Sequence, residues 1–245
     1  MKALNVENIS MNFGGIAALS NVSFNVDVGE RVAIIGPNGA GKTTLFNILN
    51  GQLKATSGSV RFFDKEITHM SIHGRAHNGI ARSFQIVNLF LGSTVLDNAV
   101  LAVQGTKPTR FRMFRPMSNY NEIYKNAEEL LKSFMLWVLK DNPVNSIAYG
   151  DQRKLEIALS LASKPKMLLL DEPNCGLTKA EGEEISRMIR DLDGDISVIM
   201  VAHDMDLVMG VAQRIIVLHF GKVIVEGPPE DVCNDPKVNE IYMGS

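Results

Sequence analysis

The chain has 245 residues, of which 45% are hydrophobic and 21% are charged; this suits one large α/β domain or such a domain with an inserted lobe. The formal net charge of −2 gives no electrostatic argument for nucleic acid as the main partner. Two cysteines that are far apart do not suggest a disulfide framework, so a reducing cytosol is expected. We find no signal peptide and no apolar run of ~20 residues, and therefore expect any membrane role to depend on a partner.

The first 28 residues have the pattern of antiparallel strands at a sheet edge. Val22, Phe24, Val26 and Val28 alternate with polar residues, which is the period of a half-buried strand. The apolar run at 31–35 then predicts a short strand.

A glycine-rich segment that fits G-x-x-x-x-G-K-[ST] follows this strand and precedes a predicted helix that ends at Gly51. Its residues are Gly36, Pro37, Asn38, Gly39, Ala40, Gly41, Lys42, Thr43 and Thr44. Successive backbone N–H groups and the N-terminus of the helix are suited to bind phosphate oxygens. We therefore predict a nucleotide site in which Lys42 reaches the β- and γ-phosphates and Thr43 binds Mg²⁺. The alternative is a glycine-rich turn without a ligand.

Residues 59–67 predict a hairpin of the same antiparallel sheet, followed by a polar helical stretch that ends near Gly79. That stretch contains His69, His73 and His77 at a spacing of four. The spacing suggests a metal-binding face, but Gly74 interrupts the helix and no carboxylate or cysteine joins the histidines at ligand spacing. We expect solvated surface.

Residues 87–146 predict helices. Thr94, with Asp97 three residues later, is the capping signal of a first helix. A second helix has apolar residues at helical spacing from Ile123 to Val138, and we expect it to continue until Asn142 and Pro143. The loop between these helices carries Arg110, Arg112 and Arg115; we expect a charged surface loop, with a nucleic-acid patch as the alternative.

The last hundred residues alternate between helix and strand, which predicts βαβ units and a parallel core sheet. Strands are expected at 167–170 and 196–202, and a helix that Thr178 and Glu181 cap lies between them. A hairpin near Gly221 and a short helical tail follow. The predicted fold is α/β: a P-loop NTPase parallel core sheet with an antiparallel β subdomain and an inserted α-helical lobe.

Two carboxylates follow the predicted strand at 167–170. Asp171 lies at the carboxyl end of the strand, where α/β sheets bind ligands, and is suited to hold Mg²⁺ directly or through water. Glu172 lies one residue further and is suited to deprotonate the water that attacks the γ-phosphate. With the phosphate loop, the pair predicts hydrolysis; the alternative is a strand that ends in acids by chance. No N-K-x-D sequence for reading guanine is present.

Residues 147–156 form a glycine-bearing turn that opens a helix shortly before Asp171, the place of the signature motif of ATP-binding-cassette ATPases. The chain resembles this family over essentially its whole length, and most closely the ATPase subunits of bacterial branched-chain amino acid importers. The segments that carry the resemblance are 38–47, 79–85, 148–153, 203–205 and 238–244. The resemblance implies one ABC ATPase domain over residues 1–245, with a nucleotide-binding core at 1–86 and 147–245 and the helical lobe at 87–146.

The resemblance also assigns roles to single residues. Phe13 stacks on adenine, although an aromatic at this place is also compatible with the core. Gln85 touches Mg²⁺ or the attacking water, and His203 hydrogen-bonds the γ-phosphate, although capping of a helix is the alternative for His203. The turn at Tyr149, Gly150 and Asp151 faces the γ-phosphate that Lys42 of a second subunit holds in a head-to-tail dimer.

The implied function is ATP hydrolysis with Mg²⁺ at the cytoplasmic face of the cell membrane, coupled to uptake of branched-chain or related amino acids. The implied partners are permease subunits, a second ATPase subunit that is identical or related, and indirectly a solute-binding protein. The alternatives are the ATPase of a lipopolysaccharide exporter, that of a urea or amide importer, and a soluble ABC protein acting on nucleic acid. Thr178 departs from the aspartate of the superfamily, which leaves its effect on subunit communication open.

Overall fold

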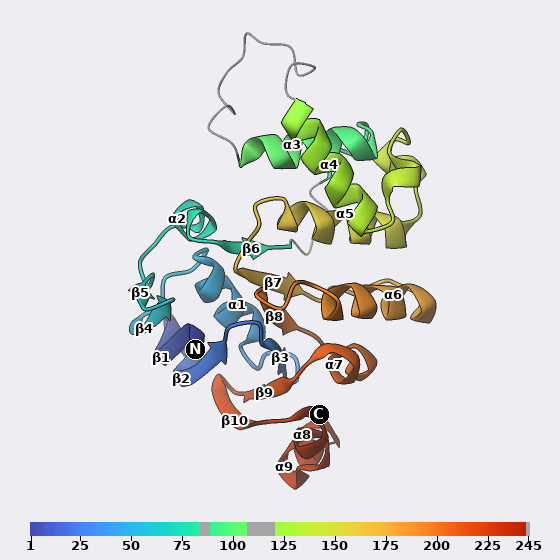
Figure 1. Cartoon of the computed structure of the whole chain (residues 1–245). Coiled ribbons are helices and arrows are strands. Elements are labelled where there is room, and N and C mark those ends of the chain that lie inside the picture. Colours follow the sequence, from blue (N-terminus) through green and yellow to red (C-terminus); the bar gives the residue numbers. More distant parts are fainter. Residues whose placement is uncertain (84–88, 107–120, 244–245) are drawn as a thin grey trace.

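The computed structural model describes residues 1–83, 89–106 and 121–243, and contains two sheets (Figure 1). The smaller sheet is antiparallel, with strand order β2-β1-β4-β5. Its strands are β1 (Lys2–Phe13), β2 (Ile16–Asp27), β4 (Ser57–Phe62) and β5 (Lys65–Glu66).

The central sheet has the order β10-β9-β3-β8-β7-β6. All its neighbouring pairs are parallel except β10 with β9. Its strands are β3 (Arg31–Ile35), β6 (Ile80–Arg82), β7 (Met167–Asp171), β8 (Ser197–Val201), β9 (Arg214–His219) and β10 (Lys222–Gly227). The predicted parallel core with an antiparallel β sheet is confirmed.

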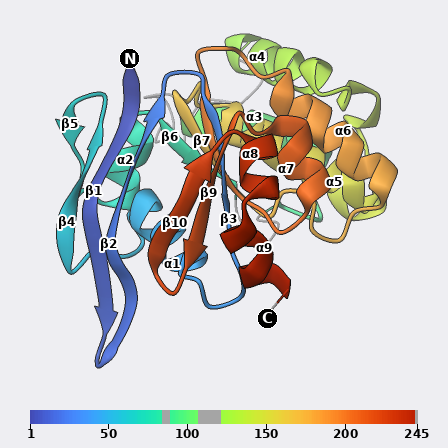
Figure 2. The same cartoon turned by 90° about the horizontal axis from the view of Figure 1, so that it is seen from below.

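Alternation along the buried strands separates two hydrophobic cores. Met167 and Leu169 pack with α1 and the antiparallel sheet, whereas Leu168 and Leu170 pack with α6 and α7 on the other face. Figure 2 shows the central sheet between these two groups of elements. The helices around the sheet are α1 (Lys42–Asn50), α2 (Ile72–His77), α6 (Lys179–Arg190), α7 (Met205–Val211), α8 (Pro229–Asn234) and α9 (Pro236–Met243).

A third core lies in the helical part of the chain, which stands above the central sheet in Figure 1. It joins α3 (Val95–Gly105), α4 (Asn121–Ser133) and α5 (Tyr149–Leu161). The predicted capping box at Thr94 and Asp97 is present. Since 84–88 and 107–120 lie outside the described residues, the lobe limits of 87–146 and the role of the arginine loop stay predictions.

The helix that the sequence extends from Ile123 to Asn142 is shorter than predicted. Helix α4 ends at Ser133, because Met135 adopts a left-handed backbone with φ 58°. A separate 3₁₀ helix then covers Trp137–Leu139, and the Val138 side chain is 84% exposed instead of lying in the core.

A buried arginine closes the end of α1. The Arg75 guanidinium donates to the carbonyl oxygens of Ile48 and Leu49, both at 2.6 Å, and to those of Ile67 and Thr68. The last carbonyls of a helix have no partner within the helix, so this side chain satisfies them. Burial lowers the pKa of Arg75 to about 10.

Across the three described ranges, no helix is both long enough and apolar enough to cross a membrane.

Candidate functional site

The phosphate loop joins β3 to α1, in the strand–loop–helix order that the sequence predicts. Two of its glycines are required by close packing. A Cβ on Gly36 would lie 2.1 Å from the Leu218 carbonyl oxygen, and one on Gly41 would lie 2.7 Å from that of Ala18. Both glycines also have positive φ, at 151° and 102°, which other residues rarely adopt. The loop is therefore fixed between β9 and the antiparallel sheet.

Lys42 begins α1 and folds back over its own loop. Its Nζ donates to the carbonyl oxygens of Gly36 at 2.6 Å and Pro37 at 2.9 Å. Burial lowers the pKa of Lys42, while the negative charge of Glu172 acts in the opposite direction. A cation at the N-terminus of a nine-residue helix makes this loop suitable for an anion.

The carboxyl ends of β3, β8 and β7 lie side by side, because these strands are neighbours in the sheet. They carry, respectively, the phosphate loop, His203 and the two carboxylates. Ligands of open α/β sheets bind at this edge. The topology thus brings together Lys42, Asp171, Glu172 and His203, four of the residues that the sequence predicts for the site.

Asp171 is buried at the end of β7 and pairs with an arginine that the sequence analysis missed. Its Oδ2 accepts a hydrogen bond of 3.0 Å from Nη2 of Arg82, the last residue of β6. Burial raises the pKa of Asp171, and the charge of Arg82 opposes this shift. The two residues are 89 positions apart, so only the pairing of β6 with β7 brings them together.

Glu172 follows with φ at 46°, a strained value for a side chain of this kind. Its backbone N–H donates to the carbonyl oxygen of Val201 at 2.9 Å, which holds it against β8. Its Oε1 lies 3.3 Å from Nδ1 of His203. A carboxylate beside an imidazole at the mouth of a phosphate loop is a suitable arrangement for activating water.

The backbone after β7 is held by Arg153, to which the sequence analysis gave no role. Arg153 is 2% exposed and donates to the carbonyl oxygens of Asp171, Glu172 and Pro173 at 2.8–3.0 Å. Its Nη1 also pairs with Glu156 at 2.5 Å. The one signal in the sequence is an Arg and a Glu three residues apart on an otherwise apolar helix face.

The predicted signature turn forms the start of α5. Gly150 fits closely against α6, since a Cβ there would lie 2.5 Å from Oε1 of Glu181. Tyr149 is 47% exposed and lies beside Gly176, while Asp151 pairs with Lys154 at 2.8 Å. In a single chain this turn packs on the loop after β7 and on the start of α6.

Thr178 caps α6. Its hydroxyl accepts the N–H of Glu181, and the Glu181 carboxylate accepts the N–H and hydroxyl of Thr178. Cys175, in the same loop, is exposed.

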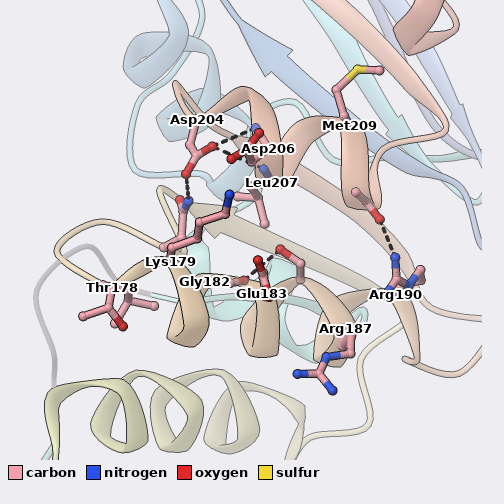
Figure 3. A pocket seen from close by; sticks show the side chains of 14 residues that line it. Thr178, Lys179, Gly182, Glu183, Arg187, Arg190, Asp204, Asp206, Leu207 and Met209 are labelled. Carbon is pink, nitrogen blue, oxygen red and sulfur yellow. Dashed lines mark hydrogen bonds between the residues drawn. The ribbon is translucent and has the colours of Figure 1, made fainter.

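A groove of 720 Å³ between α6 and α7 lies beside this loop (Figure 3). Asp204 accepts hydrogen bonds from the N–H groups of Asp206 and Leu207 and one of 2.5 Å from the Asn174 side chain. It therefore links the loop that carries Glu172 to the loop that carries His203. Asp204, rather than His203, caps α7.

Phe13 ends β1 and is 47% exposed, so it is not a core residue. Its hairpin reaches the phosphate loop through Ala18, which lies against Gly41. Gln85, the third predicted catalytic residue, lies outside the described residues.

Oxygen donors suitable for Mg²⁺ are present. Thr43 lies in the first turn of α1, and Asp171 supplies a carboxylate. This small set fits Mg²⁺, which binds through one or two protein ligands together with phosphate oxygens. Within the described ranges, no group of three or more His, Cys, Asp or Glu residues has the arrangement of a metal site. His69, His73 and His77 have exposed side chains, as expected for solvated surface.

Comparison with known proteins identifies the family. A model described as "ABC transporter" matches residues 19–175. The branched-chain amino acid transport ATP-binding protein LivG of Escherichia coli K12 is 35% identical, with 98% of this chain and 97% of LivG covered. The lipopolysaccharide export ATP-binding protein LptB of Acidithiobacillus ferridurans is 34% identical, with 98% and 96% covered.

Solved structures agree. The ADP conformation of MJ1267, an ATP-binding cassette of an ABC transporter, is 32% identical and superposes with a TM-score of 0.89 over 100% of both chains. The cassette MJ0796, in a dimeric post-hydrolysis state with ADP and Pi, is 31% identical, with a TM-score of 0.75 over 92% of this chain and 98% of that one. The chain belongs to the ABC transporter family and is one of its ATP-binding cassettes, which are ATPases.

Proposed function

We propose that this ATPase hydrolyses Mg²⁺–ATP and thereby drives uptake of branched-chain or related amino acids through a membrane permease. The observation that carries the proposal is the group of Lys42, Asp171, Glu172 and His203 at one edge of the central sheet. The importer ATPase LivG, similar over nearly its whole length, supports the class of solute.

In this proposal the residues of the phosphate loop, Gly36 to Thr44, hold the β- and γ-phosphates through N–H groups and the Lys42 ammonium. Lys42 exchanges its two carbonyl partners for phosphate oxygens. Thr43 and Asp171 would hold Mg²⁺, with Gln85 as a further ligand, and the bound ion would supply positive charge beside the transferred phosphoryl group. Phe13 stacks on adenine.

Glu172 accepts a proton from the water whose oxygen attacks the γ-phosphorus, while the bond from the γ-phosphorus to the β–γ bridging oxygen breaks and ADP leaves with that oxygen. His203, whose Nδ1 lies 3.3 Å from Oε1 of Glu172, donates a hydrogen bond toward the γ-phosphate. Arg153 holds the backbone carbonyls on both sides of Glu172, so that the strained conformation persists in the absence of nucleotide.

The working unit is a head-to-tail dimer, of two copies or of this chain with a related subunit. Within its own chain Gly150 packs on Glu181 of α6. In the dimer, the turn at Tyr149, Gly150 and Asp151 of one chain supplies the γ-phosphate contact of the other. The dimeric state of the cassette MJ0796 supports a dimer.

The permease contact is an exposed apolar patch, formed by Phe90, Leu91 and Leu101. It borders a groove of 300 Å³ that also reaches Arg82 and α5. An exposed patch of this kind commonly marks a protein contact. The protein then lies at the cytoplasmic face of the membrane through its permease, which also links it to a solute-binding protein.

Glu172→Gln tests the catalytic assignment. A general base contributes ~10²–10⁴-fold, so ATP turnover should fall by at least ~100-fold, while ATP-dependent dimers persist in size-exclusion chromatography. Glu183→Gln, an exposed glutamate of α6, is the matched control and should hydrolyse ATP normally. Vigorous turnover by Glu172→Gln would falsify the base assignment.

The solute is tested in vesicles that contain the permease which co-purifies with the chain. Leucine or valine, with the matching binding protein, should stimulate ATP turnover. Stimulation by urea or amides instead would identify a urea or amide importer. Stimulation by lipopolysaccharide would identify a lipopolysaccharide exporter. Either result would contradict the proposed solute.

A further inference from the structure

Arg82 lies at the end of β6 with its side chain 8% exposed, and most of its donors reach other side chains. Nη1 donates to Oδ1 of Asn47 at 2.8 Å and to Oε1 of Gln52 at 2.5 Å. Nη2 donates to Oδ2 of Asp171 at 3.0 Å. The guanidinium carbon lies 4.8 Å above the Phe46 ring. One side chain thus joins β6, α1 and β7 directly beside the predicted metal ligand.

Arg153 forms a buried ion pair within its own helix, with Glu156. The guanidinium hydrogen bonds of Arg31 and Arg75 go to backbone carbonyl oxygens at helix ends and turns. Arg82 instead forms an ion pair in which both side chains are more than nine-tenths buried. Its Nε is buried without a hydrogen-bond partner in the part of the chain that the structure describes. A buried N–H group without a partner lowers the stability of the fold. Satisfying the polar groups around it is therefore not enough to explain why an arginine stands at position 82.

The electrostatics of the pair decide its role. A buried carboxylate without a nearby positive charge is strongly disfavoured, and Arg82 supplies that charge at Oδ2 of Asp171. A divalent cation at the same carboxylate supplies it too, and would be repelled by the guanidinium. Asp171 therefore cannot hold the guanidinium and the metal ion together without a loss of binding free energy from their mutual repulsion.

We propose that Arg82 is a positioning residue that acts as the counterion of Asp171 while no divalent cation is bound, and that it competes with the cation for this carboxylate. The inference rests on the proposed Mg²⁺–ATP function. If Arg82 competes with the cation, it weakens metal binding to the enzyme that has no nucleotide. It also keeps the Asp171 carboxylate in place until metal and nucleotide arrive together. Because Arg82 also contacts Asn47 and Gln52, its release would change the contacts at the carboxyl end of α1.

The test measures metal affinity rather than activity. Mn²⁺ is titrated into the ADP-saturated protein, and free Mn²⁺ is followed by electron paramagnetic resonance. Arg82→Gln removes the competing charge and should bind Mn²⁺ ~3-fold or more tightly, whereas Arg82→Lys keeps a positive charge and should stay within about twofold of the unmodified protein. Weaker or unchanged Mn²⁺ binding by Arg82→Gln would overturn the proposal.

Asp171→Asn serves as the background control, because it keeps the shape of the side chain without its charge. In that background, Arg82→Gln should leave Mn²⁺ affinity unchanged. A thermal-unfolding series separates the proposal from a structural role: Arg82→Gln should lower the melting temperature more without Mn²⁺–ADP than with it, since the metal replaces the missing charge. Equal losses in both states would mean that Arg82 is structural.

If Arg82→Gln does not fold, the unmodified protein provides the measurement. The Arg82 Nε–H resonance, assigned from its absence in Arg82→Lys, should shift when Mg²⁺ is added to the ADP-saturated protein. An unmoved resonance would contradict the proposal. Failure of the unmodified protein to bind Mn²⁺ with any nucleotide would instead refute the proposed function, which makes the two failures distinguishable.

Discussion

Arg153 holds the backbone around Glu172, the proposed general base. Its guanidinium satisfies three carbonyl oxygens of 171–173 and pairs with the Glu156 carboxylate. Removal of one partner of a buried ion pair typically costs about 3–5 kcal/mol. Arg153→Met should therefore lower the free energy of unfolding by about that amount, measured by chemical denaturation.

The same variant should lose ATP turnover by more than it loses ATP affinity, because Glu172 loses its support while the phosphate loop does not. Arg187→Met, an exposed arginine of α6, is the control and should change the unfolding free energy by less than about 0.5 kcal/mol. If Arg153→Met and the unmodified protein unfolded at the same midpoint concentration of denaturant, these contacts would contribute little to the free energy of unfolding.

The roles of two buried arginines, Arg82 and Arg153, could not be predicted from the sequence. Lys42, Asp171, Glu172 and His203 were predicted from local patterns and from the resemblance, and the strand order places them at one edge of the sheet. Arg82 and Arg153 act through contacts with segments 18–89 positions away, and nothing near them in sequence signals those partners. The resemblance could not supply them either, since it was read from motifs and not from side-chain contacts.

Helix ends in this chain are largely predictable when capping residues mark them. Thr94 and Thr178 both form the capping boxes that the sequence predicts. The predicted end of α4 was wrong. The apolar spacing continues through Val138, whereas the helix breaks at Met135, whose backbone is in the left-handed conformation. Periodicity reports which face a residue would occupy, and it does not report backbone conformation.

The capping box also gives a physical reason why threonine is tolerated at 178. Threonine, aspartate and asparagine are all favoured at the N-cap, because each offers a side-chain oxygen to the first N–H groups. Thr178→Asp should keep the free energy of unfolding, whereas Thr178→Ala should lower it by about 1 kcal/mol.

Denaturation curves of Thr178→Ala, Thr178→Asp and the unmodified protein test this expectation. Ser186→Ala, within the same helix and outside its cap, is a suitable control. Equal stability of all three proteins would mean that α6 begins without help from its cap. Loss of ATP-dependent dimers in Thr178→Asp would show that the residue matters for subunit communication beyond capping.

At the scale of the whole molecule, α5 connects the helical part to the nucleotide edge. Leu155 and Ala158 pack in the third core with α3 and α4, while Ile157 packs with the central sheet. Arg153 of the same helix holds the loop before α6. A displacement of the helical part would thus reach Glu172 through a single rigid element, which is the coupling that a transporter ATPase requires.

The exposed patch at 90, 91 and 101 is held in place from within α3. Asn98, 2% exposed, accepts the N–H of Phe90 at 2.9 Å and donates to its carbonyl oxygen at 3.1 Å. The Phe90 ring is therefore presented to solvent by a fixed backbone, and an apolar ring fixed in this way is suited to a partner's pocket.

Replacement of the patch should separate coupling from catalysis. Phe90→Ser combined with Leu101→Ser removes side chains that are 61% and 44% exposed, so basal ATP turnover and the unfolding free energy should stay nearly unchanged. Solute-stimulated turnover with the permease in vesicles should fall ~10-fold or more, since a buried hot spot contributes at least about 2 kcal/mol to a contact. Val138→Ser, exposed on the same helical part, should leave the stimulation intact. Full stimulation in the double variant would remove the patch from the permease contact, while an equal loss in Val138→Ser would point to a general effect of surface polarity on assembly.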